Sequence, residues 1–134
     1  MADEELVAAF EDATLPAPAF TQAAHVRVAW WYLRQAPLPE ALARFSRALR
    51  RFAAAQGAAD KYHETTTVAW MALVGERLQA SPDLGWDAFA ARYPELLVRT
   101  PSILAHYYSG ARLQSETARR TFVLPDRAGQ RPGS

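Results

Sequence analysis

Apolar residues recur every three or four positions through most of the chain, which is the spacing of helices that bury one face. The pattern is clearest in residues 39–56, where Leu42, Phe45, Leu49 and Phe52 share one side and arginines occupy much of the other. No stretch shows the alternation of an amphipathic strand. The pattern therefore predicts an all-α protein, a single-domain irregular helical bundle of five to seven helices over residues 1–126.

Capping residues and prolines divide this pattern into elements. We expect N-caps at Thr21, Asp60, Ser81 and Thr100, and a helix stop at Gly57. Residues 127–134 are rich in Gly, Pro and Arg and are predicted to form a disordered C-terminal tail. The expected helices cover residues 2–11, 22–35, 39–56, 61–80 and 83–92, with shorter ones near 95–98, 100–108 and 115–122.

The stretch 60–74 carries the strongest indication of a site. Its first residues are polar, and His63, Thr67, Trp70 and Val74 fall at i, i+4, i+7 and i+11, on one face of the expected helix. That face should pack on the core, where an unpaired polar group costs free energy. His25 borders the apolar side of the second helix. We therefore predict a buried polar pocket between the second and fourth helices, with His25 and His63 close together.

Acid–base chemistry is one interpretation of this pocket. His63 would transfer the proton, His25 would be its partner, and Glu64 would help to orient them. The candidate catalytic residues are thus His63, His25 and Glu64, and the candidate ligand-binding residues are Tyr62, Thr67, Trp70, Tyr108 and Arg119.

Two other interpretations stay open. The histidines His25, His63 and His106 could bind a transition metal, most simply at His25 and His63. No two of them have a metal-binding spacing such as HxxxH, so we expect no metal and no cofactor. Alternatively, the protein is a non-enzymatic interaction or regulatory module in which the same polar residues form a structural network.

Composition narrows the classes of partner. Half of the residues are hydrophobic and the formal net charge is +1, so neither nucleic acid nor a membrane is an expected partner. The absence of cysteine excludes disulfides, thiolate nucleophiles and cysteine-bound zinc. The acidic start, from Met1 to Glu5, is unlike a signal peptide, so we expect a cytoplasmic protein. A small-molecule ligand is possible, and the oligomeric state is not predicted.

The spaced motif residues resemble a family of small uncharacterised bacterial proteins, marked by a Tyr-His-Glu-Thr box, here called the YHET box (residues 62–65), and a downstream tryptophan. The resemblance covers residues 18–126, and some relatives carry the label N-formimidoyl fortimicin A synthase. It implies small-molecule chemistry in secondary metabolism. His106 has no counterpart in the pattern, whereas the matching positions are His25, Tyr62, His63, Glu64, Thr65, Thr67, Trp70, Tyr108, Ser109 and Arg119.

The density of polar side chains favours a functional site over a structural one. Tyr62, His63, Glu64 and Thr67 lie within two helical turns, which is more polarity than a core usually needs. Groups held for a ligand are often suboptimal for folding. On this interpretation, His63→Ala should keep the fold with a melting temperature near or above that of the parent.

Overall fold

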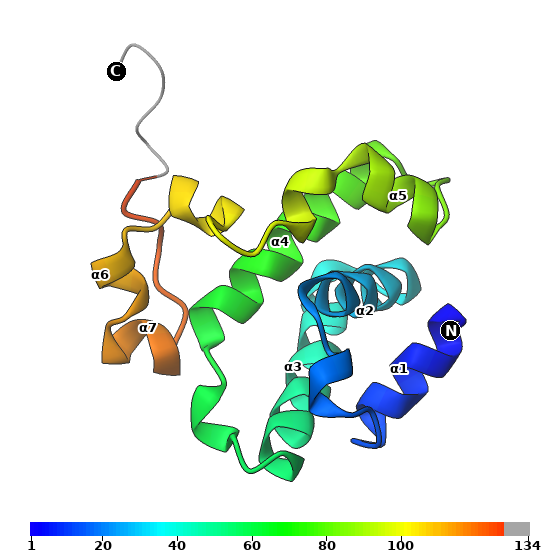
Figure 1. Cartoon of the computed structure of the whole chain (residues 1–134). Helices are drawn as coiled ribbons and strands as arrows, with labels where there is room; N and C mark the ends of the chain where they lie inside the picture. Colours follow the sequence, from blue (N-terminus) through cyan, green and yellow to red (C-terminus); the bar gives the residue numbers. More distant parts are fainter. Residues whose placement is uncertain (128–134) are drawn as a thin grey trace.

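A computed structural model describes residues 1–127, which form helices and turns without a strand (Figure 1). This confirms the all-α helical bundle predicted from the sequence. The α-helices are α1 (Asp3–Glu11), α2 (Gln22–Gln35), α3 (Leu38–Ala55), α4 (Glu64–Ala80), α5 (Trp86–Arg92), α6 (Gly110–Leu113) and α7 (Glu116–Arg120). Four short 3-10 helices join them, namely η1 (Ala17–Ala19), η2 (Ala59–Lys61), η3 (Pro94–Leu97) and η4 (Ile103–His106).

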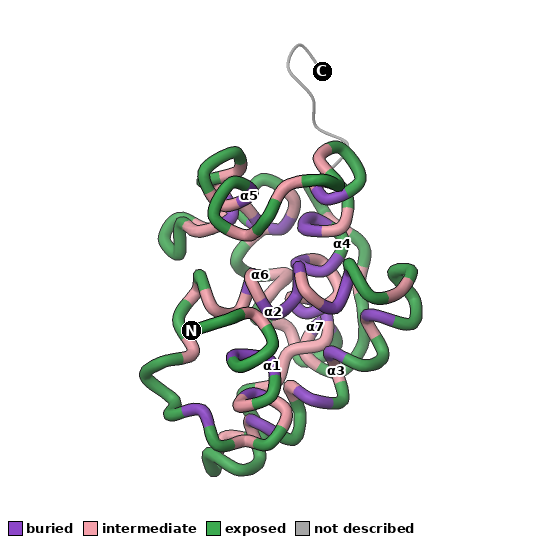
Figure 2. Tube along the Cα trace, turned by 90° about the vertical axis from the view of Figure 1, so that its right-hand side faces the viewer, coloured by how far each residue is buried: buried purple, intermediate pink, exposed green. Residues whose placement is uncertain are grey.

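Helix α2 lies at the centre of the core, against α1, α3 and α4 (Figure 1). Its residues Val28, Ala29 and Trp30 are fully buried. Phenylalanines from the neighbouring helices complete the core. Phe10 of α1, for example, stacks on Phe45 of α3 with ring centroids 5.8 Å apart. Figure 2 shows buried segments of these helices meeting inside a mostly exposed outer surface.

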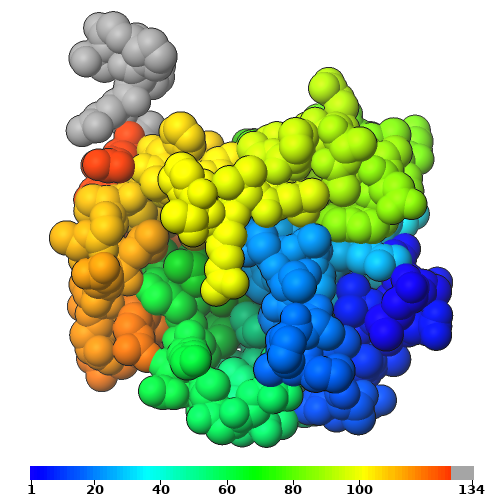
Figure 3. All heavy atoms as spheres, in the orientation of Figure 1, coloured from blue at the N-terminus to red at the C-terminus, as the bar shows by residue number. Residues whose placement is uncertain are grey.

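The C-terminal elements occupy the side of α4 that is turned away from α1. Helix α7 packs on α4, and η4 touches α4 further along its length (Figure 1). The space-filling view places these elements at the opposite end of the molecule from the N-terminal helix (Figure 3). The chain from η4 to residue 127 is called the C-terminal segment below.

Several boundaries differ from the prediction. Thr21 caps α2 as expected, since its hydroxyl accepts a hydrogen bond from the Ala24 N–H at 3.2 Å. Asp60, however, lies inside η2, and α4 begins only at Glu64 with His63 as its N-cap. Ser81 ends α4 but does not cap α5, which follows Gly85. At the starts of α4 and α5 the sequence contains more than one residue that can cap a helix, and tertiary contacts decide which of them does so.

The end of the domain also differs slightly. The Arg127 backbone N–H donates to the Tyr107 carbonyl at 2.9 Å, and its guanidinium donates to the Ala105 carbonyl at 2.8 Å. The helical domain therefore includes this residue, which the sequence assigned to the tail. The remainder of the predicted disordered tail, residues 128–134, lies outside the described residues. Within residues 1–127, no helix is both long enough and apolar enough to cross a membrane.

Candidate functional site

His63 is held by hydrogen bonds at both ring nitrogens. The Thr66 backbone N–H can only donate, so Nδ1 of His63 accepts this bond, at 3.1 Å. Nε2 then carries the proton of the neutral ring and donates to the Leu113 carbonyl at 2.7 Å. The imidazole therefore caps α4 and ties it to the last residue of α6, with neither nitrogen left free to exchange a proton with a ligand.

This role corrects the predicted helical face. As the N-cap, His63 has an extended backbone, with φ −134° and ψ 111°, so the i, i+4 relation to Thr67 does not apply to its side chain. Thr67 and Trp70 are buried as expected. The Thr67 hydroxyl donates to the His63 carbonyl at 2.8 Å, so it serves the first turn of the helix and not a ligand.

His25 lies among aromatic side chains and makes no hydrogen bond with His63. Its ring meets Phe20, Phe45 and Trp70 edge-on, with centroids 5.6, 5.4 and 6.4 Å away. Its buried Nδ1 has no hydrogen-bond partner among the described residues. Burial lowers the pKa of His25 to about 4, so the ring is neutral near pH 7. The predicted pair does not form because His25 faces the aromatic core while His63 faces α6.

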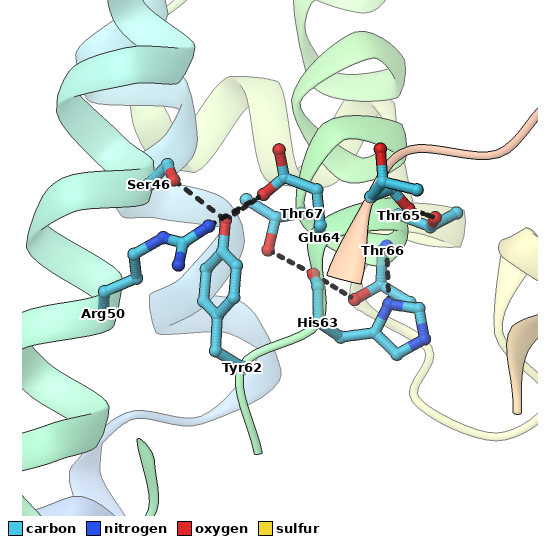
Figure 4. Close-up of polar contacts among 9 residues, drawn as sticks. Ser46, Arg50, Tyr62, His63, Glu64, Thr65, Thr66 and Thr67 are labelled. Atoms are coloured by element: carbon cyan, nitrogen blue, oxygen red, sulfur yellow. Dashed lines mark hydrogen bonds and ion pairs between the residues drawn. The ribbon is translucent and has the colours of Figure 1, made fainter. Parts of the chain in front are cut away.

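Tyr62 and Glu64 form a second polar group, between α3 and α4 (Figure 4). The Tyr62 hydroxyl donates to the Glu64 carboxylate at 2.7 Å and lies 2.8 Å from the Ser46 hydroxyl. Arg50 covers the Tyr62 ring, 4.1 Å from its centroid, and is 3.4 Å from the Glu64 carboxylate. Burial raises the pKa of Tyr62. Figure 4 shows the imidazole of His63 directed away from this group, so Glu64 does not orient it.

Thr65 joins the C-terminal segment to α4. Its side chain is completely buried, and its hydroxyl donates to the Thr121 carbonyl at 2.9 Å while accepting from the Val123 N–H at 3.1 Å. Tyr108 supports the same stretch of chain, since its hydroxyl donates to the Val123 carbonyl at 2.8 Å. Burial raises the pKa of the Tyr108 phenol.

Two further contacts hold the C-terminal segment in place. The Asp126 carboxylate accepts from the Ser109 hydroxyl at 2.6 Å and from the Ser109 N–H at 2.8 Å, which lowers the pKa of that carboxyl. Arg119 donates to the Asp60 carbonyl, which joins α7 to η2. We call the following residues the C-terminal clasp: His63, Thr65, Tyr108, Ser109, Arg119 and Asp126.

The clasp includes residues that the sequence did not assign to a site. Thr65 and Ser109 were named only as positions of the predicted resemblance, and Asp126 was not among those positions. The structure shows that Thr65 bonds to Thr121 and Val123, and that Ser109 bonds to Asp126. Arg119 is committed to a backbone carbonyl, although the sequence suggested a ligand for it. Among the described residues, no group of three or more His, Cys, Asp or Glu side chains is arranged to hold a metal ion.

A groove of about 230 Å³ lies between α4 and the C-terminal segment. Of the predicted ligand-binding residues, only Tyr108 lines it. The sequence does contain an indication of this groove. Helix α4 is apolar on both sides, since Val68, Ala69 and Ala72 lie outside its buried stripe. The lining residues are Val68, Ala69, Ala72, Leu73, Glu76, Leu104, Tyr107, Tyr108, Phe122 and Pro125.

Comparison with known proteins adds no assignment. No protein-family model, no curated protein and no solved structure matches this chain. The resemblance stated above stays a prediction, and the function must be argued from the geometry.

Because His63 makes two hydrogen bonds, we now expect its replacement by alanine to destabilise the protein, contrary to the expectation from the sequence. His63→Ala removes an N-cap and the link to Leu113, and should lower the free energy of unfolding by about 1–2 kcal/mol. His63→Asn keeps a good capping group but not the reach to Leu113, so it should lie between Ala and the parent. Urea unfolding of the three proteins tests this order, and an alanine variant as stable as the parent would contradict it.

Thr65→Val should loosen the C-terminal segment without disturbing the core. The substitution keeps the shape of the side chain but removes the hydroxyl that two backbone groups need, at a cost of about 1–2 kcal/mol. Hydrogen exchange of the Val123 amide should become faster. Thr117→Val, at an exposed position of α7, is the matched control and should leave that amide unchanged. Equal exchange in both variants would show that the Thr65 hydroxyl does not hold the segment.

His25 should make stability depend on pH. Because its pKa is about 4 in the fold against 6.5 in the unfolded chain, the unfolded state binds the proton first as pH falls. The stability contributed by neutral His25 is complete above pH 6.5 and is lost as pH approaches 4, with a loss of about 2 kcal/mol between pH 7 and 5. His25→Phe should lack this component in urea unfolding at the two pH values. Parallel losses in parent and variant would refute the assignment.

Proposed function

We propose that this protein binds a small molecule in the groove between α4 and the C-terminal segment, and that the clasp, which includes His63 and Thr65 of the YHET box, holds the two sides of the groove together. The supporting observation is the groove itself, which is mostly apolar, has few polar groups and has one wall fixed by the clasp. Small-molecule sites usually have this composition. A cytoplasmic location and the absence of a nucleic-acid partner remain part of the proposal.

The hydrogen bonds favour binding over acid–base catalysis. Both nitrogens of His63 have partners, and the ring of His25 packs edge-on against aromatic side chains. The Glu64 carboxylate accepts from Tyr62 and faces Arg50. Each of the three residues proposed as catalytic from the sequence therefore has a structural contact that explains its position.

A protein-interaction module is the second candidate. The motif residues form a polar network of the kind this alternative required, and Leu124 and Phe122 are exposed, at 70% and 40%. A protein partner could cover them. The groove beside Phe122 favours a small molecule as the first candidate, since it is a concave site and not only an exposed surface.

Filling the groove provides the test. Ala72 is exposed and lines the groove, so Ala72→Trp should occlude it with little effect on folding. Ala43→Trp, at an exposed position of α3, is the matched control. Small neutral aromatic probes such as 2-phenylethanol should shift the amide resonances of residues 68–76, 104–108 and 122–124 in the parent and in Ala43→Trp, but not in Ala72→Trp.

Two results would overturn the proposal. Probe-induced shifts spread over the surface would mean that the groove is not a site. Shifts that persist in Ala72→Trp would mean that the probes bind elsewhere.

A further inference from the structure

Among residues 1–127, Glu76 is the only charged residue that lines the groove. It lies on the exposed side of α4, and none of its helical neighbours can pair with it, because positions 72, 73, 79 and 80 are Ala, Leu, Gln and Ala. No ion pair among the described residues includes it. Glu95, which lines another surface hollow, is by contrast paired with Arg77 at 2.8 Å. Glu76 therefore presents an uncompensated negative charge at an apolar site.

Aromatic rings form the facing part of the groove. Tyr107, Tyr108 and Phe122 line it, and Tyr108 is fixed by its bond to the Val123 carbonyl. The faces of such rings carry negative electrostatic potential and attract cations. No arginine or lysine from the described part of the chain lines the groove, so both kinds of electrostatic attraction are available to a ligand.

The size of the groove limits the ligand. Its volume of about 230 Å³ is smaller than the 300–1,000 Å³ of usual ligand pockets, so the ligand is small. A single ring with a short chain matches this space. Leu73 and Leu104 offer apolar contact for the ring, and Glu76 offers a partner for a charged end.

We propose that the groove selects an organic cation, an ammonium group on a short chain attached to a ring, with the ammonium beside Glu76 and the ring against the aromatic wall. This inference rests on the proposed function and specifies its ligand class. An anion of the same shape is disfavoured by Glu76, and a neutral analogue gains only the apolar contact.

Three probes with one skeleton separate these contributions: 2-phenylethylamine, 2-phenylethanol and 3-phenylpropanoate. Titrations followed by amide resonances of the ¹⁵N-labelled protein should give the tightest binding for the amine, by about threefold to tenfold over the alcohol. The carboxylate should bind most weakly. Because the advantage of the amine is electrostatic and exposed to solvent, added salt should reduce it and leave the alcohol unchanged.

Substitution of Glu76 assigns the effect. Glu76→Gln keeps the shape and removes the charge, so the affinity for the amine should fall to that for the alcohol. Glu4→Gln removes an exposed charge on α1 and should change neither. Equal binding of amine and alcohol by the parent, or an amine preference that survives in Glu76→Gln, would overturn the cation inference while leaving small-molecule binding in place. Failure of all three probes to shift the groove resonances would overturn both proposals.

Discussion

The polar groups in the first turn of α4 need hydrogen-bond partners at a point where α4, α6 and the stretch 121–123 meet. A helix start leaves backbone N–H groups without partners inside the helix. Here the His63 ring accepts from one of them and also reaches α6, while the Thr65 hydroxyl serves both a donor and an acceptor of the C-terminal segment. The segment between Thr121 and Val123 has no sheet or helix of its own to satisfy its backbone. Its position therefore depends on side chains of α4.

Periodicity predicted the helical class because it reflects burial directly. Phe45 and Phe52 repeat on the core face of α3. Thr21 caps α2 because its hydroxyl can accept a hydrogen bond from a free N–H of the first helical turn. The start of α4 was placed too early. Asp60 and His63 are both able to cap a helix, and the choice between them depends on Leu113, 50 residues away. Local sequence carries no information about that contact.

The candidate site was harder to predict for a related reason. A polar group on a buried face indicates that a partner exists, but a substrate atom and a backbone carbonyl satisfy it equally well. The partner of Thr65 is an irregular stretch of chain with no periodic pattern, so the sequence pointed to a ligand. The prediction for His25 failed for another reason. A neutral imidazole can pack against aromatic side chains without a polar partner, and one of these, Phe20, precedes the expected helix.

The wall of the groove that contains Phe122 and Pro125 can open separately from the core of the domain. Phe122 and Pro125 belong to residues 121–127, none of which is buried and which are held mainly by hydrogen bonds. Local opening of this stretch should therefore require less free energy than unfolding of the core around Trp30. A molecule that touches both α4 and this wall binds only the closed arrangement. Its occupancy and the order of the chain end are then thermodynamically linked, so each stabilises the other by the same amount.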